Sequence, residues 1–419
     1  MKSKFYQSVR ERFIRYAKID TQSSTGADTV PSTQKQFDLA KLLLKELEEM
    51  GASDIFLDEH CCLYAKLPSN IKDRNVRSIG YLGHLDVSPD AASAGISPHV
   101  LENYGGGDIV LNADKGIVME ASLYPRLSMY IGQDLILSDG TTLLGGDDKA
   151  AIATIMAMAE YYTEHPEIPH GDICIGFLPD EEVGLCGAKL FDIERFGAEA
   201  AYTLDGDGVG EFFEETFNGE EAFVAIKGLN VHPGTAKNIM RNAVEIAAEF
   251  IAMLPALERP QHTSDREGFY HPTSIMGSVE EAEIRLILRD HDGLRLEERH
   301  NYLVKCAETL NARLGEGSVS IKFVPGYRSM KPVVDKHPYL TEYALRAMRD
   351  CGIQPRISPM RGGTDGAVLS QRGLPCPNIT AGYENAHGRF EFVPVESMAK
   401  NAELLLRLNQ IYAEEFLNT

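Results

Sequence analysis

The stretch Phe177-Leu-Pro-Asp-Glu-Glu-Val-Gly184 decides the fold that we predict for this chain. An apolar run, Ile173 to Leu178, ends just before three consecutive carboxylates, which is typical of a buried strand that stops at the edge of a sheet. If the chain turns there, Glu181 and Glu182 share one site, where one can ligate a cation while the other accepts a proton from water. Taken alone, such a pair is more often a solvated acidic turn, because charged side chains are mostly exposed.

The composition is that of a globular protein. The chain has 419 residues, of which 43% are hydrophobic and 25% are charged, and this length predicts about two to three domains. The formal net charge of -21 argues against broad binding to nucleic acid or to an anionic membrane surface. We therefore expect neither a nucleic acid nor a membrane as a partner.

The N-terminus and the cysteines predict a cytoplasmic location. The first twelve residues, Met1 to Arg12, lack the apolar segment of a secretion signal. No later apolar run approaches the roughly 18 residues of a membrane span. The seven cysteines show no paired metal-type spacing apart from the adjacent Cys61 and Cys62, which fits reduced thiols in a reducing compartment.

Two further apolar runs end in polar residues of the same kind. The run from Ser78 to Val87 contains His84-Leu-Asp86, and side-chain alternation puts the histidine and the aspartate on the same side of a strand. A metal-ligating imidazole usually donates its other N–H to a carboxylate, and Asp86 is placed to accept it. The run from Ala200 ends directly before Asp205. Each of these residues alone is more often an ordinary polar group.

The sequence Gly145-Gly-Asp-Asp-Lys-Ala150 opens a long, mostly apolar helical run. Asp147 and Asp148 therefore lie at a helix N-terminus, where acids are common capping residues. A carboxylate in a glycine-framed turn can also reach two cations at once, and Asp147 is the candidate for such a bridge. The preceding segment, 91–137, reads as a long connection that carries short strands.

Apolar strands that alternate with helical stretches predict an α/β sheet, whose ligand sites lie at the carboxyl ends of the strands. From about Thr216 the pattern changes, and we predict an inserted α+β sandwich domain over 217–326. The flanking ranges, 1–216 and 327–419, would form one catalytic domain. Within the insertion we expect strands and helices in the order 221–231, 238–253, 283–289, 294–314 and 319–324.

Six short motifs in this order resemble those of the dinuclear zinc exopeptidases, the family that includes carboxypeptidase G and the aminoacylases. The resemblance runs over nearly the whole chain. The motifs are Gly83-His-Leu-Asp86, Leu144-Gly-Gly-Asp-Asp-Lys149, Pro179-Asp-Glu-Glu-Val-Gly184, Tyr202-Thr-Leu-Asp-Gly206, Val231-His-Pro-Gly-Thr-Ala-Lys237 and Arg361-Gly-Gly-Thr-Asp-Gly366.

The resemblance implies a centre with two Zn²⁺ ions per subunit. Asp147 would bridge the two ions, with His84 and Asp205 completing one site and Glu182 and His387 the other. It also implies that Asp86 orients His84 and that Glu181 is the general base. Manganese or cobalt could occupy the same mixed set of imidazole and carboxylate ligands.

The resemblance also assigns roles to the inserted domain. His232 would act in catalysis, brought to the metals by domain closure or, in dimeric relatives, supplied by the partner subunit. The insertion would then be a lid and the surface of a homodimer. Independently of the resemblance, Arg289, which ends a strand of the insertion, and Arg361, which precedes a glycine pair outside it, are candidates for binding the substrate's C-terminal carboxylate, because a planar guanidinium suits bidentate capture of a carboxylate. A surface or fold-supporting ion pair is the alternative for each.

The implied activity is hydrolysis of the N-terminal peptide bond of short peptides, tripeptides in particular. A related dipeptidase, carboxypeptidase or N-acyl amino acid amidohydrolase is the alternative, because ligands set the reaction while pocket walls set the substrate. A non-catalytic peptide-binding homologue is a more distant alternative, which the complete set of expected residues disfavours.

Overall fold

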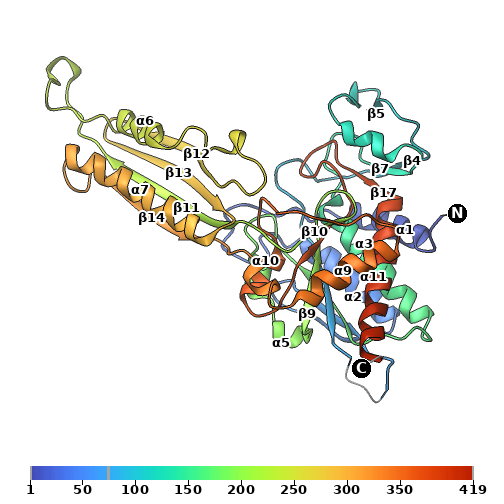
Figure 1. Cartoon of the computed structure of the whole chain (residues 1–419). Coiled ribbons are helices and arrows are strands. Elements are labelled where there is room, and N and C mark those ends of the chain that lie inside the picture. The colour runs from blue at the N-terminus through green and yellow to red at the C-terminus, as the bar shows by residue number, and fades with distance from the viewer. Residues whose placement is uncertain (1, 73–75, 418–419) are drawn as a thin grey trace. The chain divides into compact units, whose positions relative to one another are not determined.

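The computed structural model, which describes residues 2–72 and 76–417, divides into two compact units (Figure 1). The first unit comprises Met1–Glu214, Pro332–Ser358 and Thr364–Thr419, and the second comprises Glu215–Lys331 and Pro359–Gly363. The segment 359–363, which we expected in the catalytic range, lies with the second unit because Phe217 N–H donates to the carbonyl oxygens of Met360 (3.2 Å) and Gly362 (3.3 Å). The predicted insertion, 217–326, falls inside this unit.

The first unit is built on an eight-stranded mixed sheet. Its centre, β8-β3-β9-β16, is parallel, and antiparallel strands flank it. The three longest central strands are buried at every residue, as expected for a sheet covered on both faces. In spatial order the strands are β1 (Ser53–Leu57), β2 (Leu63–Leu67), β8 (Ile173–Leu178), β3 (Ile79–His84), β9 (Ala200–Leu204), β16 (Asn378–Ile379), β10 (Glu211–Phe213) and β15 (Arg356–Ile357).

Helices pack against this sheet, so the predicted α/β fold is confirmed. Helix α3 (Gly146–Glu164) contacts β3, and α1 (Tyr6–Ala17) and α11 (Val395–Leu417) lie beside it (Figure 1). Almost every residue of α3 is buried, which explains its apolar, alanine-rich sequence. The other helices are α2 (Gln36–Glu49), α4 (Cys186–Leu190), α5 (Ile193–Phe196), α8 (Lys331–Val334), α9 (Pro338–Asp350) and α10 (Asp365–Gln371).

Helix α2 begins at Gln36. The residues just before it take part in a hydrogen-bond network with the turn that contains Glu181 and Glu182. The Asp180 carboxylate accepts hydrogen bonds from the backbone N–H (2.5 Å) and the hydroxyl (2.6 Å) of Ser32. It also accepts one from the Gln36 amide (2.6 Å). This network holds the residues before Gln36 out of the helix and fixes the start of the turn.

The long connection before α3 carries short strands, as predicted. Strands β17, β7 and β4 form a three-stranded sheet, and β5 and β6 form a hairpin. The 3₁₀ helix η1 lies between β6 and β7, and the segment encloses its own small apolar core. The elements are β4 (His99–Leu101), β5 (Ile109–Asn112), β6 (Ile117–Met119), η1 (Pro125–Tyr130), β7 (Leu135–Leu137) and β17 (Phe392–Pro394).

The second unit is a four-stranded antiparallel sheet packed against two helices, α6 (Ala243–Met253) and α7 (Gly293–Leu314). The sequence did not predict strand β12. This strand contains Pro272 and is largely exposed, which suits a strand paired on one side only. The strands, in spatial order, are β12 (Phe269–Gly277), β13 (Glu281–Asp290), β11 (Asn218–Lys227) and β14 (Val319–Pro325), with short 3₁₀ helices η2 (Pro233–Thr235) and η3 (Pro260–His262).

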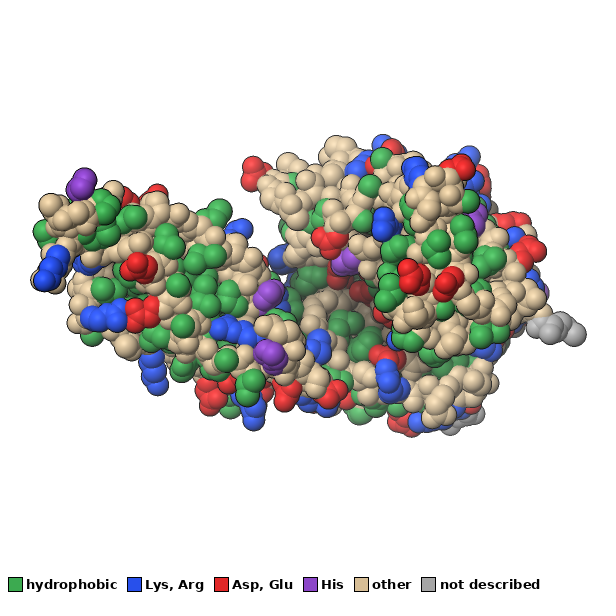
Figure 2. All heavy atoms as spheres, turned by 90° about the horizontal axis from the view of Figure 1, so that it is seen from above, with side chains coloured by type: hydrophobic (Ala, Val, Ile, Leu, Met, Phe, Trp, Pro, Cys, Tyr) green, Lys and Arg blue, Asp and Glu red, His purple; other side chains and the backbone are tan. Residues whose placement is uncertain are grey.

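The surface carries charges of both signs. On the face shown in Figure 2, Lys and Arg side chains are interspersed with Asp and Glu over each unit, as is typical of a solvated surface. Among the described residues, no helix combines the length and the apolar character needed to cross a membrane.

Candidate active site

The polar residues predicted at the strand ends meet at one edge of the sheet. His84 is the last residue of β3, Asp205 directly follows β9, and the turn with Glu181 and Glu182 follows β8. Since β8, β3 and β9 are parallel neighbours, their carboxyl ends lie together. Asp147 reaches the same edge from the start of α3, where its backbone is not yet helical (φ -80°, ψ 101°).

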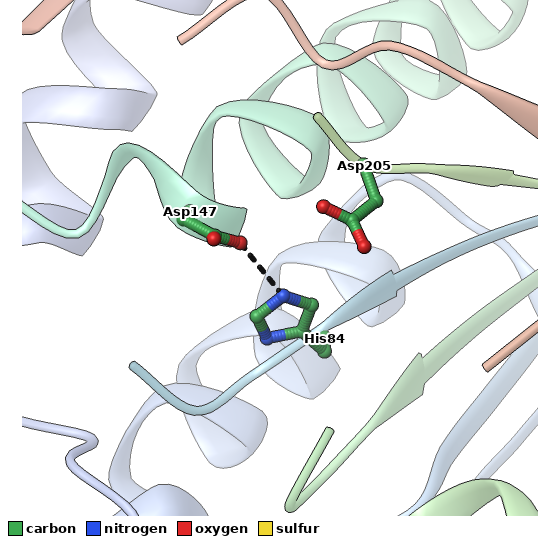
Figure 3. Close-up of side chains that lie close together, drawn as sticks. All are labelled: His84, Asp147 and Asp205. Atoms are coloured by element: carbon green, nitrogen blue, oxygen red, sulfur yellow. Dashed lines mark hydrogen bonds and ion pairs between the residues drawn. The ribbon is translucent and has the colours of Figure 1, made fainter. Parts of the chain in front are cut away.

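Two groups of side chains at this edge could each hold a metal ion, and both groups contain Asp147. The first comprises His84, Asp147 and Asp205, and the second Asp147, Glu182 and His387; in each group the ligand atoms lie within 4.8 Å of one another. Figure 3 shows Asp147 and Asp205 on either side of the His84 ring, whose Nε2 is 2.9 Å from Asp147 Oδ1. His387 Nε2 lies 3.3 Å from Asp147 Oδ2 and 2.9 Å from Glu182 Oε2.

Each histidine turns its other ring nitrogen to an aspartate. His84 Nδ1 is 3.0 Å from the backbone carbonyl oxygen of Asp86 and 3.4 Å from its carboxylate. His387 Nδ1 is 3.2 Å from the carboxylate of Asp90. Such contacts fix the orientation of a ligating imidazole. Asp90 was not predicted from the sequence.

Asp86 also shapes the Glu-Glu turn. Its carboxylate is fully buried and accepts hydrogen bonds from the backbone N–H groups of Glu181 (2.9 Å) and Glu182 (3.3 Å). One residue therefore contacts His84, through its backbone carbonyl oxygen and its carboxylate, and fixes the backbone that carries both glutamates.

Several carboxyl groups lie close together in the buried part of this site. Burial raises the pKa of the Glu182 carboxyl to about 7, and the charge of Asp147 adds to that shift. Burial and Asp147 also raise the pKa of Asp205. Burial would lower the pKa of His84, but its hydrogen bonds to Asp147 and Asp86 raise it well above the usual value. A bound cation relieves this crowding, since it favours the ionised form of each carboxylate.

The geometry also fits a metal ion directly. Glu182 Oε1 is buried and has no hydrogen-bond partner among the residues that the structure describes. A buried carboxylate oxygen without a partner is costly unless a cation binds it. Two imidazoles and three carboxylates form a donor set that zinc accepts.

Glu181 lies close to these residues but, among the described residues, is a member of neither candidate metal-binding group. Burial raises the pKa of its carboxyl well above the usual value, and the charges of Asp205 and Asp365 add to the effect. A carboxyl group with a raised pKa is suited to taking up and releasing a proton near neutral pH.

Besides Asp90, three further supporting residues were missed by the sequence reasoning. The Tyr383 hydroxyl donates to Asp205 Oδ1 (2.6 Å). Asp148 accepts the backbone N–H of His84 (3.1 Å). The Glu391 carboxylate accepts three backbone N–H groups in the turn that carries Asp147, from Leu144 (2.9 Å), Gly145 (2.7 Å) and Asp147 itself (2.9 Å). The alternation Phe390-Glu-Phe392 would place Glu391 on the face opposite to the two phenylalanines, so the sequence carries no signal for its burial.

The three remaining predicted residues belong to the second unit. His232 is exposed, and its Nδ1 accepts the backbone N–H of Gly234 (3.1 Å). Arg289, in β13, donates through Nη1 to the carbonyl oxygen of Leu288 (2.9 Å). Arg361 donates to the carbonyl oxygens of Asp265 and Glu267 (2.9 Å each) and to the Thr263 hydroxyl (2.9 Å). Their functional roles stay predictions.

The chain belongs to peptidase family M20/M25/M40, whose family model matches residues 145–410. It is 48% identical over 407 residues to peptidase T of Clostridium botulinum, an alignment that covers 97% of this chain and 99% of that protein. The family resemblance predicted from the six motifs is therefore confirmed.

Solved structures agree in fold. The aminopeptidase PepT of Bacillus cereus is 26% identical, with a TM-score of 0.78 over 97% of this chain and 99% of that one. The Bacillus subtilis YXEP protein, described as a dinuclear metal binding peptidase of the M20 family, has a TM-score of 0.66 at 14% identity, over 98% of this chain and 99% of that one. The latter likeness shows the fold alone.

Proposed function

We propose that this protein is a metal-dependent aminopeptidase that hydrolyses the N-terminal peptide bond of short peptides, tripeptides in particular. The observation that carries the proposal is the shared carboxylate of Asp147, whose two oxygens face a histidine of each ligand group, with Glu181 beside them. The similarity to peptidase T and to the B. cereus aminopeptidase supports the substrate class. A cytoplasmic location fits this role.

The proposed centre would hold two Zn²⁺ ions per subunit. Asp147 would bind both ions, with His84 and Asp205 as the other ligands of the first and Glu182 and His387 as those of the second. Manganese or cobalt also suits these ligands. When bound, the two ions would lower the pKa of a water molecule and polarise the peptide carbonyl.

Residues of the chain then transfer the proton of the attacking water. Glu181 accepts a proton from the attacking water and passes it to the amine that leaves when the peptide bond breaks. Asp86 positions this base through the Glu181 backbone and positions His84 through its ring. The base and a first-site ligand are thus held by the same buried residue.

The first prediction concerns the reaction and its substrate. We expect the metal-loaded protein to hydrolyse a tripeptide with a free N-terminus, to stop when the metal is chelated, and to recover when zinc is added. In a substrate panel kcat/KM should be highest for tripeptides, compared with dipeptides, N-acyl amino acids and peptides cut at the C-terminus. A higher kcat/KM for any of these three classes would instead support the corresponding alternative enzyme.

The second prediction is that Glu181→Gln lowers kcat by about 10²–10⁴-fold, as expected for loss of a general base. Metal content, measured by elemental analysis, should stay at the wild-type value because the substitution spares the proposed ligands. Glu194→Gln, which changes an exposed glutamate of the same unit, is the matched control. A metal-loaded Glu181→Gln variant with wild-type kcat would rule out this role.

We further propose that Arg289 or Arg361 binds the C-terminal carboxylate of the substrate. Among the described residues, the Arg289 guanidinium forms hydrogen bonds through Nη1 only, whereas Arg361 uses both Nη1 and Nη2. Arg289 therefore keeps more of its donors for a carboxylate, which guanidinium groups bind in a bidentate manner.

The third prediction follows from this. Arg289→Met should raise KM for a free tripeptide much more than for the same tripeptide with an amidated C-terminus, because the amide lacks the charge that the guanidinium binds. Arg361→Met serves as the comparison within the same unit. Equal losses on the free and the amidated peptide in both variants would contradict the assignment.

The inserted domain is proposed to be a lid and the surface of a homodimer, and His232 to stabilise the developing oxyanion. His232 is exposed and available for such a contact. A donor beside the oxyanion stabilises the transition state more than the ground state, which raises kcat.

The fourth prediction is that His232→Ala lowers kcat by about 10²-fold or more while both metals stay bound. If each site takes its histidine from a partner subunit, mixing the His232→Ala and Glu181→Gln variants should restore part of the activity. Some sites would then combine an intact base with an intact histidine. No recovery, despite proven subunit exchange, would leave closure within one chain as the route.

A further inference from the structure

His387 is the least constrained member of the two ligand groups. Its side chain is 42% exposed, whereas that of His84 is 3% exposed. Its Nδ1 partner, Asp90, is itself 67% exposed, and exposed ion pairs contribute little to holding a geometry. The position of His387 must therefore come from the loop that carries it.

Two backbone hydrogen bonds between Glu384 and Phe392 close the loop that carries His387. The N–H of Glu384 donates to the carbonyl oxygen of Phe392 (2.9 Å), and the N–H of Phe392 donates to that of Glu384 (3.0 Å). Inside the loop, the Asn385 amide donates to the carbonyl oxygen of Phe390 (3.1 Å). His387 lies near the middle of this loop, so its place depends on where the closing pair is held.

Two residues of the 3₁₀ helix η1 hold the closing pair, Glu384 and Phe392, in place. The Glu384 side chain is fully buried, and its Oε1 accepts hydrogen bonds from Arg126 Nη2 (2.6 Å) and from the Tyr130 hydroxyl. The ring of Tyr130 packs edge-on against Phe392, with ring centroids 5.5 Å apart. Tyr130 thus contacts both residues of the closing pair.

A second aromatic contact joins this part of the connection to the His387 loop. Tyr124, next to the start of η1, packs on Phe390 with ring centroids 5.4 Å apart. These residues belong to the small apolar core of the connection between β4 and β7. The connection between β4 and β7 therefore supports the loop that carries His387, which its sequence did not predict.

We propose that Glu384, held by Arg126 and Tyr130, is a positioning residue for His387 and sets the affinity of the second metal site. The inference rests on the proposed dinuclear centre. The first site is linked to this loop only indirectly, through Tyr383, which donates to Asp205, and through Glu391, which fixes the backbone of the shared Asp147. Its His84 lies at the end of a buried strand. Loosening the Glu384 contacts should therefore weaken the second metal site more than the first.

The test is a zinc titration of the metal-free full-length protein in competition with a chromophoric chelator, which gives a dissociation constant for each ion. In Glu384→Gln and in Arg126→Met, we expect one of the two constants to rise by about 10–100-fold, the usual effect of losing a supporting contact. The other constant should rise by a clearly smaller factor. Excess zinc should restore kcat.

Glu46→Gln is the matched control. Glu46 is another buried glutamate of the first unit that accepts hydrogen bonds from a tyrosine, Tyr16 (2.6 Å), and from arginines, Arg12 and Arg15. This control should bind both ions as the wild type does, even if its melting temperature falls. Should Glu384→Gln fail to fold, Arg126→Met and Tyr130→Phe carry the test, since each leaves one donor on Glu384.

Unchanged zinc affinities in the folded variants, or an equal loss at both sites, would overturn the proposal. A wild-type protein that binds fewer than two zinc ions would overturn the dinuclear centre itself, and this inference with it. The two failures are therefore distinguishable in one titration.

Discussion

The Asp147 carboxylate, with one oxygen facing each histidine, is the constraint on which the site depends. A carboxylate that serves two groups tolerates little rotation, since turning it toward one group withdraws it from the other. The backbone of Asp147, at the start of α3, is accordingly fixed by a residue outside that helix. The Glu391 carboxylate accepts the Asp147 N–H and two more N–H groups of the preceding turn. The start of α3 is therefore shaped by an anchor from a distant part of the chain.

The same edge of the sheet concentrates negative charge at a high cost. Taking a carboxylate out of water costs on the order of several kcal/mol per ion unless partners compensate. Here burial raises the pKa values of Glu181, Glu182 and Asp205. The fold can maintain this arrangement because the surrounding strands and α3 are densely apolar. The stability of the core thus supports a polar cluster that would otherwise favour an open, hydrated turn.

The sequence predicted those parts of the site that follow from local pattern. Apolar strands ending in His84 and Asp205 indicated a shared edge, because parallel strands place their carboxyl ends together. It could not predict Glu391 or Glu384, since a single acid in a loop looks like a surface residue until its distant hydrogen-bond donors are known. Strand β12 was missed for a related reason: an exposed edge strand with a proline lacks the alternation that marks a half-buried strand.

The two ligand groups differ in how the fold holds them. His84 and Asp205 lie on or next to the central strands, and their supporting contacts come from two buried residues, Asp86 and Tyr383. His387 instead belongs to a loop whose closing pair is held by η1. The sheet fixes the first group as part of the core, so changing it would disturb the fold. The η1 contacts act on the second group through His387, whereas Asp147, which both groups share, is fixed through Glu391, so the position of His387 can change without any change in the ligands.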